Sequence, residues 1–366
     1  MIFNKHLSNI TVYEAGKPIE LVVRDFGIDK KDIVKMASNE NPFGMSKKVS
    51  KLISENSAKA SLYPDDSMFE LKDALSKRFN VDNDEVIIGA GSDQILEFIS
   101  RAILNSETKV LMNKVTFAMY SIYAKQMDSN IITTNSIHHD LDQFLEIYKR
   151  EQPEIIFICT PNNPTGDVIT KDNLYNFLEK IDKNTLVVVD GAYMEYAKYK
   201  NPDTEIKPHQ LIEKFPNTIY LGTFSKAFGL GGMRIGYGIG KKEIVDNLYK
   251  VRPPFNITTL SLLSGIEALK DMQFVENTVN INFTEMKRFE SFLNDLGFDY
   301  IDSFTNFITI FLHENSYNSS TISNDLLRNG IIIRDLKGYG LNAIRVTVGK
   351  PEENSKFFKI FKNILL

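Results

Sequence analysis

A lysine between an apolar run and a glycine-rich segment constrains this chain more than any other feature of its sequence. Residues 218–240 read TIYLGTFSKAFGLGGMRIGYGIG, with Lys226 just after the apolar run. Such a pattern is typical of a buried strand that ends in a turn. A lysine in a desolvated place is costly to keep charged, so the neutral amine becomes available. Because condensation with an aldehyde requires a neutral amine, Lys226 is the candidate reactive group.

The same segment carries groups suited to a phosphate. Thr223 and Ser225 come just before Lys226, and Arg234 follows the glycines. Hydroxyl groups donate hydrogen bonds, the planar guanidinium matches phosphate geometry, and glycines let the backbone approach closely. An aldehyde-reactive lysine beside a phosphate site indicates pyridoxal phosphate. Taken alone, the segment is also compatible with a glycine-rich loop that carries a surface lysine.

Length, charge and cysteine content exclude several classes of protein. A chain of 366 residues favours one large domain with a smaller one. A net charge of −4 without a Lys/Arg block offers no basic surface for nucleic acid. The single cysteine, Cys159, lies in an apolar run, which predicts a buried thiol in a reducing compartment. No signal-peptide core and no run of about 20 apolar residues is present, so we expect a soluble cytoplasmic protein.

A second candidate phosphate site lies where a short strand pattern runs into a helical one. Residues 85–88 predict a strand, GAGSDQ follows at 89–94, and 95–104 predict a helix. The first NH groups of a helix lack internal partners and lie at the positive end of its dipole, so they stabilise an anion. Ser92 and Asp93 stand at this junction, where Ser92 can equally cap the helix. The glycine spacing is not that of the dinucleotide fingerprint, which disfavours a nicotinamide cofactor.

A near-continuous apolar run at 186–189 ends on Asp190. Runs of this kind are typical of parallel strands buried on both faces, and ligands of open α/β sheets bind at the carboxyl ends of such strands. A carboxylate there can pair with a protonated pyridine nitrogen, so that the ring accepts electrons. A helix cap or a turn acid is the alternative explanation. Further strands are predicted at 110–112 and 155–159, and a helix at 67–79.

The last third of the chain has helical patterns at 260–272 and 275–296, then a strand at 307–311, a helix at 322–328 and a strand at 331–333. Arg334 and Arg345 each lie at the edge of an apolar run, where an unpaired charge is expensive. Either an ion pair within the protein or an anionic ligand would explain them. The five histidines show no metal-ligand spacing, so no metal site is predicted.

Together these motifs resemble those of the histidinol-phosphate aminotransferases, which are fold-type-I pyridoxal-phosphate enzymes of class I/II. The resemblance rests on YEAGKPIE, ASNENPFG, LYPDD, GAGSDQ, PNNPTG, GTFSKAFGLGGMRIGYG and AIRVTVG, and so covers nearly the whole chain. It implies an α/β fold with a mostly parallel central sheet in a large domain, plus a smaller α+β domain. The implied divisions are an N-terminal arm with part of the small domain at 1–43, the large cofactor domain at 44–274 and the small domain at 275–366.

The resemblance also implies a role for each matching residue. The catalytic residues would be Lys226, Asp190 and Tyr193. The cofactor ring would be held by Phe117, Asn163, Asp190 and Tyr193, and its phosphate by Ser92, Asp93, Thr223, Ser225, Arg234 and Tyr63. In the family, the tyrosine that matches Tyr63 reaches into the neighbouring subunit, which implies a homodimer. The substrate would contact Tyr13, Asn39, Arg334 and Arg345.

The implied activity is amino transfer between glutamate or 2-oxoglutarate and a small phosphorylated substrate, with histidinol phosphate and imidazole-acetol phosphate of histidine biosynthesis as the first choice. Three alternatives stay open: amination of a three-carbon ketone phosphate such as dihydroxyacetone phosphate in a surface-polysaccharide route, decarboxylation of a phosphorylated amino acid, and a catalytically silent ligand-binding relative. Two positions depart from the family pattern: Phe117, where many relatives have tyrosine, and Gly191, where an acid or alanine is frequent.

Overall fold

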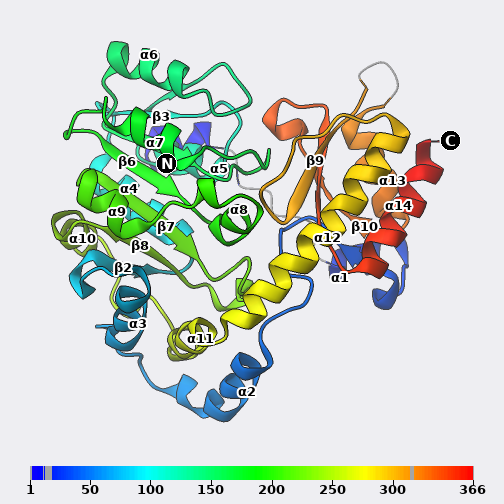
Figure 1. Cartoon of the computed structure of the whole chain (residues 1–366), viewed down its shortest axis with the longest axis horizontal. Helices are drawn as coiled ribbons and strands as arrows, with labels where there is room; N and C mark the ends of the chain where they lie inside the picture. Colours follow the sequence, from blue (N-terminus) through cyan, green and yellow to red (C-terminus); the bar gives the residue numbers. More distant parts are fainter. Residues whose placement is uncertain (1, 11, 13–18, 314–316, 366) are drawn as a thin grey trace.

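The computed structural model describes residues 2–10, 12, 19–313 and 317–365. In this part of the chain the strands form a seven-stranded sheet, a three-stranded sheet and a two-stranded sheet. The seven-stranded sheet lies in one part of the molecule and the two smaller sheets in another, with a long helix running between them (Figure 1). Tyr13, which is predicted to approach the substrate, lies outside the described residues.

The large sheet has the strand order β2-β8-β7-β6-β5-β3-β4. β8 is antiparallel to both of its neighbours, and the remaining neighbouring pairs are parallel. The predicted mostly parallel sheet is therefore confirmed. The bounds are β2 Val86–Gly89, β3 Lys109–Met112, β4 Asn130–Thr133, β5 Ile155–Cys159, β6 Leu186–Asp190, β7 Thr218–Thr223 and β8 Gly236–Gly240.

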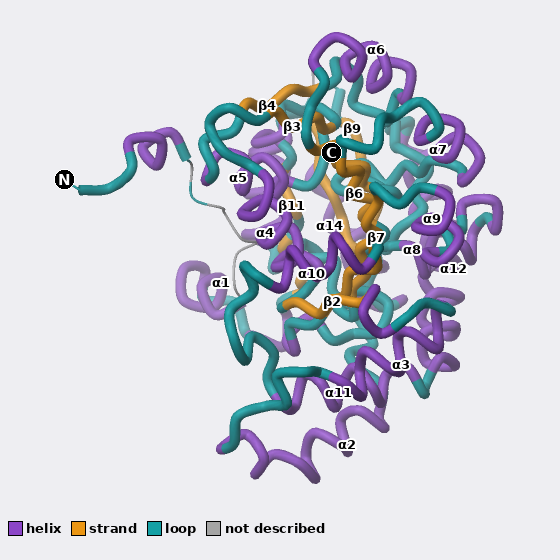
Figure 2. Tube along the Cα trace, turned by 90° about the vertical axis from the view of Figure 1, so that its left-hand side faces the viewer, coloured by secondary structure: helices purple, strands orange, loops and turns teal. Residues whose placement is uncertain are grey.

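Helices cover both faces of this sheet because side chains on successive residues of its strands point to opposite sides. Phe157 of β5 packs in the cluster with α4, α5 and α10, whereas its neighbour Ile158 packs with α6, α7, α8 and α9. Figure 2 shows the strands between α4, α5 and α10 on the left and α7, α8 and α9 on the right. The helices of this part are α2 Lys47–Asn56, α3 Phe69–Phe79, α4 Ser92–Ile103, α5 Ala118–Gln126, α6 Leu141–Glu151, α7 Lys171–Leu178, α8 Met194–Lys200, α9 Pro208–Lys214, α10 Lys242–Tyr249 and α11 Thr259–Leu269.

The smaller part has an antiparallel sheet in the order β11-β12-β9 and a parallel pair of strands, β1 and β10. Its core contains Phe289, Phe357 and Phe361, which pack with residues of β9 and β12. The division of the chain at residues 43 and 274 stays a prediction. The elements here are α1 Ile19–Phe26, β1 Val34–Lys35, α12 Met272–Leu296, β9 Phe307–Phe311, α13 Ser319–Arg328, β10 Ile331–Ile332, β11 Arg334–Asp335, β12 Ala343–Thr347 and α14 Pro351–Leu365.

Several predicted bounds differ from those of the structure, and three of the differences have a local reason. The helix predicted from residue 95 begins at Ser92, because Gly91 has a positive φ of 80° and turns the chain directly into α4. The helix predicted to reach residue 272 ends at Leu269, since Asp271 leaves helical geometry and accepts hydrogen bonds from the side chains of residues 46 and 48. The strand predicted at 331–333 ends at Ile332, because β11 begins at Arg334 and belongs to a different sheet. None of the helices in the described part is long and apolar enough to cross a membrane.

Candidate active site

A cavity at the carboxyl ends of β5, β6 and β7 brings most of the predicted residues together. This is where the open edge of a parallel sheet leaves room for a ligand. Of the predicted cofactor residues, all of which the structure describes, only Tyr63 is absent from its lining. The lining residues are Gly91, Ser92, Asp93, Phe117, Cys159, Asn163, Asp190, Ala192, Tyr193, Thr223, Ser225, Lys226 and Arg234.

Lys226 follows β7 and is held where its amine can act as a base or nucleophile. Its Nζ lies 3.4 Å from the backbone oxygen of Ser38 and 5.5 Å from the centre of the Tyr193 ring. Burial, and then the positive charges of Arg345 and Arg234, lower the pKa of Lys226 to about 8. More of the amine is therefore neutral near neutral pH than in an ordinary lysine, as the sequence predicts for this residue.

The lowered pKa gives a direct expectation for the pH dependence of the apoenzyme. Only the neutral amine condenses with an aldehyde, so covalent capture of pyridoxal phosphate should become faster as the pH rises, with a midpoint near pH 8 rather than near 10.5. Stopped-flow absorbance after mixing measures this rate. Arg345→Gln removes a positive charge and should move the midpoint to higher pH. A wild-type midpoint above pH 10 would contradict the effect of burial.

Asp190 ends β6 and presents a buried carboxylate at the floor of the cavity. Burial raises its pKa, while hydrogen bonds from the Tyr120 hydroxyl and the Ala192 backbone NH, at 2.7 and 3.1 Å, favour the charged form. A buried carboxylate with two donors on its oxygens suits a protonated ring nitrogen as its third partner. Sequence reasoning missed Tyr120, which stacks on Phe157 with ring centres 4.6 Å apart.

The opposite end of the cavity is lined by hydrogen-bond donors. Arg234 reaches this end, and its guanidinium donates to the backbone oxygen of Gly231 at 3.0 Å and lies 3.4 Å from Ser225 Oγ. The backbone NH of Ser225 and the Thr223 hydroxyl lie 3.1 Å apart beside it. The N-terminus of α4 approaches at Gly91, where a Cβ atom would lie only 2.8 Å from Arg234 Nη2. Hydroxyls, a guanidinium and a helix N-terminus form a donor set that fits a phosphate dianion.

Asp93 also lines this end, but its carboxylate is an acceptor. The Tyr123 hydroxyl donates to Asp93 Oδ2 at 3.1 Å, and burial raises the pKa of the carboxyl group. Within the described residues Asp93 Oδ1 is buried without a hydrogen-bond partner. The structure thus places Asp93 at the predicted cavity, where its backbone NH belongs to the first turn of α4.

A second cluster surrounds Asn163 and Tyr193 at the side of the cavity. Asn163 Oδ1 accepts a hydrogen bond from Arg345, which also donates to the backbone oxygen of Ala37 at 2.7 Å. The carboxamide of Asn163 therefore has its Nδ2 group left as a donor to a ligand. Asn39 is buried and donates to the Tyr193 hydroxyl at 2.8 Å. Two of the predicted substrate residues, Asn39 and Arg345, thus contact predicted cofactor residues directly.

Arg334 and Tyr63 do not line this cavity. Arg334 pairs in register with Arg345 across β11 and β12, but it lines an adjoining hollow. Phe117 lines both spaces. Tyr63 is 84% exposed and packs on Phe255 with ring centres 4.8 Å apart.

The structure explains the departure from the family pattern at Gly191. A Cβ atom on Gly191 would lie 2.3 Å from Tyr220 Oη and 2.5 Å from the ring carbon that carries it. Tyr220 belongs to β7 and is buried against this position. Any larger residue after Asp190 would therefore displace a buried aromatic side chain, so glycine at 191 and tyrosine at 220 are matched to each other.

Comparison with known proteins identifies the chain. Residues 31–360 match the family model described as aminotransferase class I and II. The chain belongs to this family. This aminotransferase is 59% identical to the histidinol-phosphate aminotransferase of Sulfurimonas denitrificans, over 98% of this chain and 99% of that protein. It is 56% identical to the enzyme of that name from Aliarcobacter butzleri, over 100% of this chain and 99% of that protein.

A solved structure gives the same fold. It is the histidinol-phosphate aminotransferase of Sinorhizobium meliloti in complex with pyridoxal-5'-phosphate, with a TM-score of 0.90 at 22% sequence identity. The match covers 99% of this chain and 98% of that chain. The predicted family, fold class and reaction class are therefore confirmed, and pyridoxal phosphate is the cofactor that this family membership entails.

Proposed function

We propose that this aminotransferase exchanges an amino group between glutamate and 2-oxoglutarate on one side and histidinol phosphate and imidazole-acetol phosphate on the other. The observation that carries the substrate assignment is 59% identity, over nearly the full length of both chains, to a relative of that name. The reaction would belong to histidine biosynthesis. The buried free thiol of Cys159 supports a reducing, cytoplasmic location.

The proposed roles follow from the geometry. Bound pyridoxal phosphate supplies an aldehyde and a ring that accepts electrons. Lys226 Nζ would hold the cofactor at its aldehyde carbon and, once free, its amine would move the proton that leaves the substrate Cα. Asp190 would keep the ring nitrogen protonated. Asn163 Nδ2 and the Tyr193 hydroxyl would hold the ring oxygen, and Phe117 would pack on the ring.

The remaining residues bind anionic groups. Arg345, which already touches Asn163, would hold the carboxylate of glutamate or the phosphate of the second substrate. Arg334 would act from the adjoining hollow, Asn39 would hold Tyr193 in place, and Tyr13 would close over the substrate from the N-terminal arm. The cofactor phosphate would be bound by Ser92, Asp93, Thr223, Ser225 and Arg234.

We further propose a homodimer in which Tyr63 completes the phosphate site of the neighbouring subunit. Three large exposed side chains lie close together in the sequence: Leu62, Tyr63 and Phe69. A fourth, Phe255, is also exposed, and its ring contacts that of Tyr63. An exposed apolar patch of this kind is typical of a surface that another protein covers. Tyr63 does not reach the cavity of its own chain, so a hydroxyl contact to that phosphate requires a second copy.

Mixing a variant with weakened cofactor binding and an inactive variant tests this arrangement. Tyr63→Ala should raise the Kd for pyridoxal phosphate about 10-fold, since a hydrogen bond to a charged group is lost. In a heterodimer of Tyr63→Ala with Lys226→Ala, one site has both Lys226 and Tyr63, so half of the sites should regain normal affinity and turnover. The double variant Tyr63→Ala/Lys226→Ala mixed with wild type is the control. No recovery in the first mixture would place Tyr63 in its own subunit's site, or outside both.

Single half-reactions test the substrate. The enzyme loaded with pyridoxal phosphate is mixed with one donor at a time, and the loss of cofactor absorbance is followed. We expect rapid loss with glutamate and with histidinol phosphate, and none with serinol phosphate or phosphoserine. Loss with serinol phosphate would favour a three-carbon ketone phosphate as the substrate, and release of carbon dioxide from phosphoserine would favour decarboxylation. A protein that stays colourless with added cofactor would be a silent relative.

A further inference from the structure

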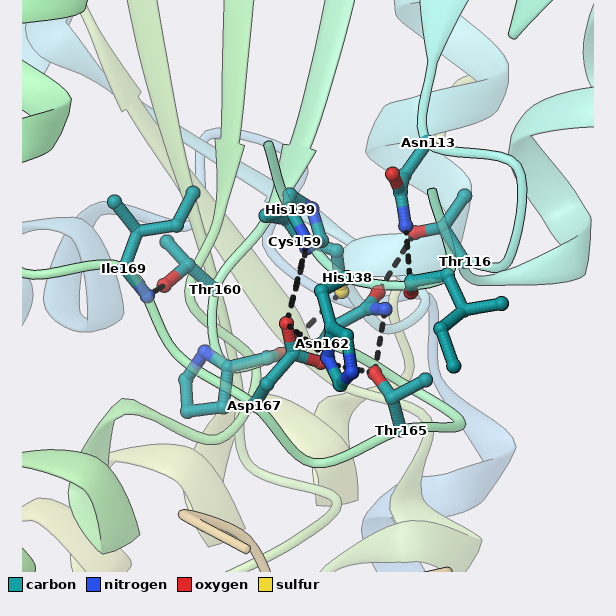
Figure 3. A network of polar contacts seen from close by, with 12 residues as sticks. Asn113, Thr116, His138, His139, Cys159, Thr160, Asn162, Thr165, Asp167 and Ile169 are labelled. Atoms are coloured by element: carbon teal, nitrogen blue, oxygen red, sulfur yellow. Dashed lines mark hydrogen bonds and ion pairs between the residues drawn. The ribbon is translucent and has the colours of Figure 1, made fainter. Parts of the chain in front are cut away.

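A polar network behind the cavity joins the loop of Asn163 to two neighbouring loops (Figure 3). The loop runs from Thr160 to Asp167, after β5. His138 and His139 lie between β4 and α6, and Thr116 lies between β3 and α5. Asp167 stands at the centre of the network, where one carboxylate oxygen accepts from Thr165 and the other faces His138 and His139. The proposed function above gives none of these side chains a task.

The hydrogen bonds of the network run in one direction and end on the carboxylate. The Thr116 hydroxyl donates to Asn162 Oδ1 at 2.9 Å, and Asn162 Nδ2 donates to Thr165 Oγ1 at 2.7 Å. The Thr165 hydroxyl in turn donates to Asp167 Oδ1. Thr165 uses its one proton for this bond, because its oxygen already accepts from Asn162. Position 167 must therefore offer an acceptor, since Asn162, Thr165 and Thr116 are buried away from water.

The second oxygen of Asp167 faces the segment before α6. The backbone NH of His139 donates to it at 3.3 Å, and the Nδ1 atoms of His138 and His139 each lie 3.8 Å away. Although burial opposes ionisation, the neighbouring His138 and His139 side chains and the hydrogen bond from Thr165 hold the pKa of Asp167 well below its usual range. The His139 ring stacks on Phe144, which fixes this side of the network in the core.

The network is connected to the cavity wall at two points, the loop of Asn163 and the segment of Phe117. The backbone NH of Asn162 donates to the backbone oxygen of Asp167 at 2.8 Å, which closes the loop around Asn163. Asn163 lines the cavity from this loop. Phe117, the residue after Thr116, lines it from the segment before α5. A displacement of the Asp167 carboxylate would therefore move Asn163 and Phe117, which face the cavity.

We propose that Asp167 is a positioning residue of this active site, whose carboxylate holds the loop 160–166 and the segment before α5 so that Asn163 and Phe117 keep their places on the cavity wall. This inference rests on the proposed function, in which Asn163 faces the ring oxygen and Phe117 the ring. Asp167 touches neither cofactor nor substrate, and acts through Thr165 and Asn162.

Four variants separate positioning from simple stability. Asp167→Ala removes the acceptor, whereas Asp167→Asn keeps an oxygen for Thr165. Thr165→Val breaks the network one step earlier and leaves Asn162 Nδ2 without that acceptor. Asp140→Ala is the matched control: Asp140 lies next to His139, accepts the NH groups of Asp142 and Gln143 at 3.1 Å, and caps α6 without touching the loop of Asn163.

The measurements are the Kd of each apoenzyme for pyridoxal phosphate, the pH at which the absorbance of bound cofactor changes, and the melting temperature. Asp167→Ala and Thr165→Val should raise the Kd by about 10-fold or more and shift the absorbance transition, because small misplacements at a site are costly. Asp167→Asn should lose less affinity than Asp167→Ala, because its one oxygen still accepts from Thr165 although its NH2 group cannot accept from the His139 NH. Asp140→Ala should lower the melting temperature by a few degrees and leave the Kd and the absorbance transition unchanged.

The inference is overturned if Asp167→Ala and Thr165→Val bind cofactor as wild type does, or if Asp140→Ala weakens binding as much as they do. It is also overturned if Asp167→Asn loses as much affinity as Asp167→Ala, since the restored acceptor would then have no effect. Failure of the wild-type apoenzyme to bind pyridoxal phosphate would instead overturn the proposed function.

Discussion

Replacing Lys226 by alanine is expected to abolish transamination, with kcat reduced by at least about 10⁴-fold, while the cavity still admits pyridoxal phosphate. The lysine has two proposed tasks, to bind the aldehyde carbon and to move the proton. Of the lysines that the structure describes, Lys226 alone lines the cavity, so no neighbour can replace it. The phosphate donors and Asp190 do not depend on Lys226, so binding persists.

Steady-state turnover and a cofactor titration measure these two effects separately. Lys214→Ala is the matched control, because Lys214 forms a half-exposed ion pair with Glu179 away from the cavity and should change neither quantity. Turnover of Lys226→Ala above about 1% of wild type would show that another group carries out the chemistry.

Asp190→Asn is expected to reduce kcat by about 10³-fold, the next largest effect. The amide has the size of the carboxylate and can still accept the hydroxyl proton of Tyr120, so packing is preserved. It lacks the negative charge that would keep the ring nitrogen protonated, and electron withdrawal by the ring would be lost. The comparison variant Tyr120→Phe keeps the charge and removes one hydrogen bond, so its loss should be nearer 10-fold.

The kcat of both variants with glutamate, and their melting temperatures, separate charge from packing. Near wild-type kcat in Asp190→Asn would contradict the pairing of Asp190 with the ring nitrogen. Equal losses in Asp190→Asn and Tyr120→Phe would show that the geometry of the carboxylate matters more than its charge.

The sequence predicts the core of the site because local patterns determine it. The apolar runs of β6 and β7 form parallel strands, so Asp190 and the residues before Lys226 necessarily meet at one edge of the sheet. The family motifs then predict an anion-binding end around Arg234. These residues line one cavity in the structure.

Other features depend on contacts that a local pattern does not contain. β8 reads GYGIG, and strands are normally poor in glycine, so its pattern does not indicate a strand. Glycine is required there because a Cβ atom on Gly236 would lie 2.2 Å from the backbone nitrogen of Ser92. The position of α4 thus explains the composition of a strand that is distant in sequence.

Tyr120 and Asp167 are not predicted as site residues for the same reason. The Tyr120 hydroxyl donates a hydrogen bond to Asp190, which lies 70 residues later in the sequence. The pattern around Tyr120 indicates only the start of a helix. Asp167 follows the PNNPTG motif, and its partners His138 and His139 come from another loop. Arg334 lies next to Arg345 in register, yet the structure places it in the adjoining hollow.

Borohydride reduction of the enzyme loaded with pyridoxal phosphate, followed by peptide mass spectrometry, tests the central claim most directly. Reduction makes the bond between a lysine amine and the aldehyde carbon permanent. We predict one labelled residue, Lys226, and we predict that histidinol phosphate added before reduction prevents the label because its amino group displaces the lysine. A label on another lysine, or a label on Lys226 that persists in the presence of histidinol phosphate, would contradict the account.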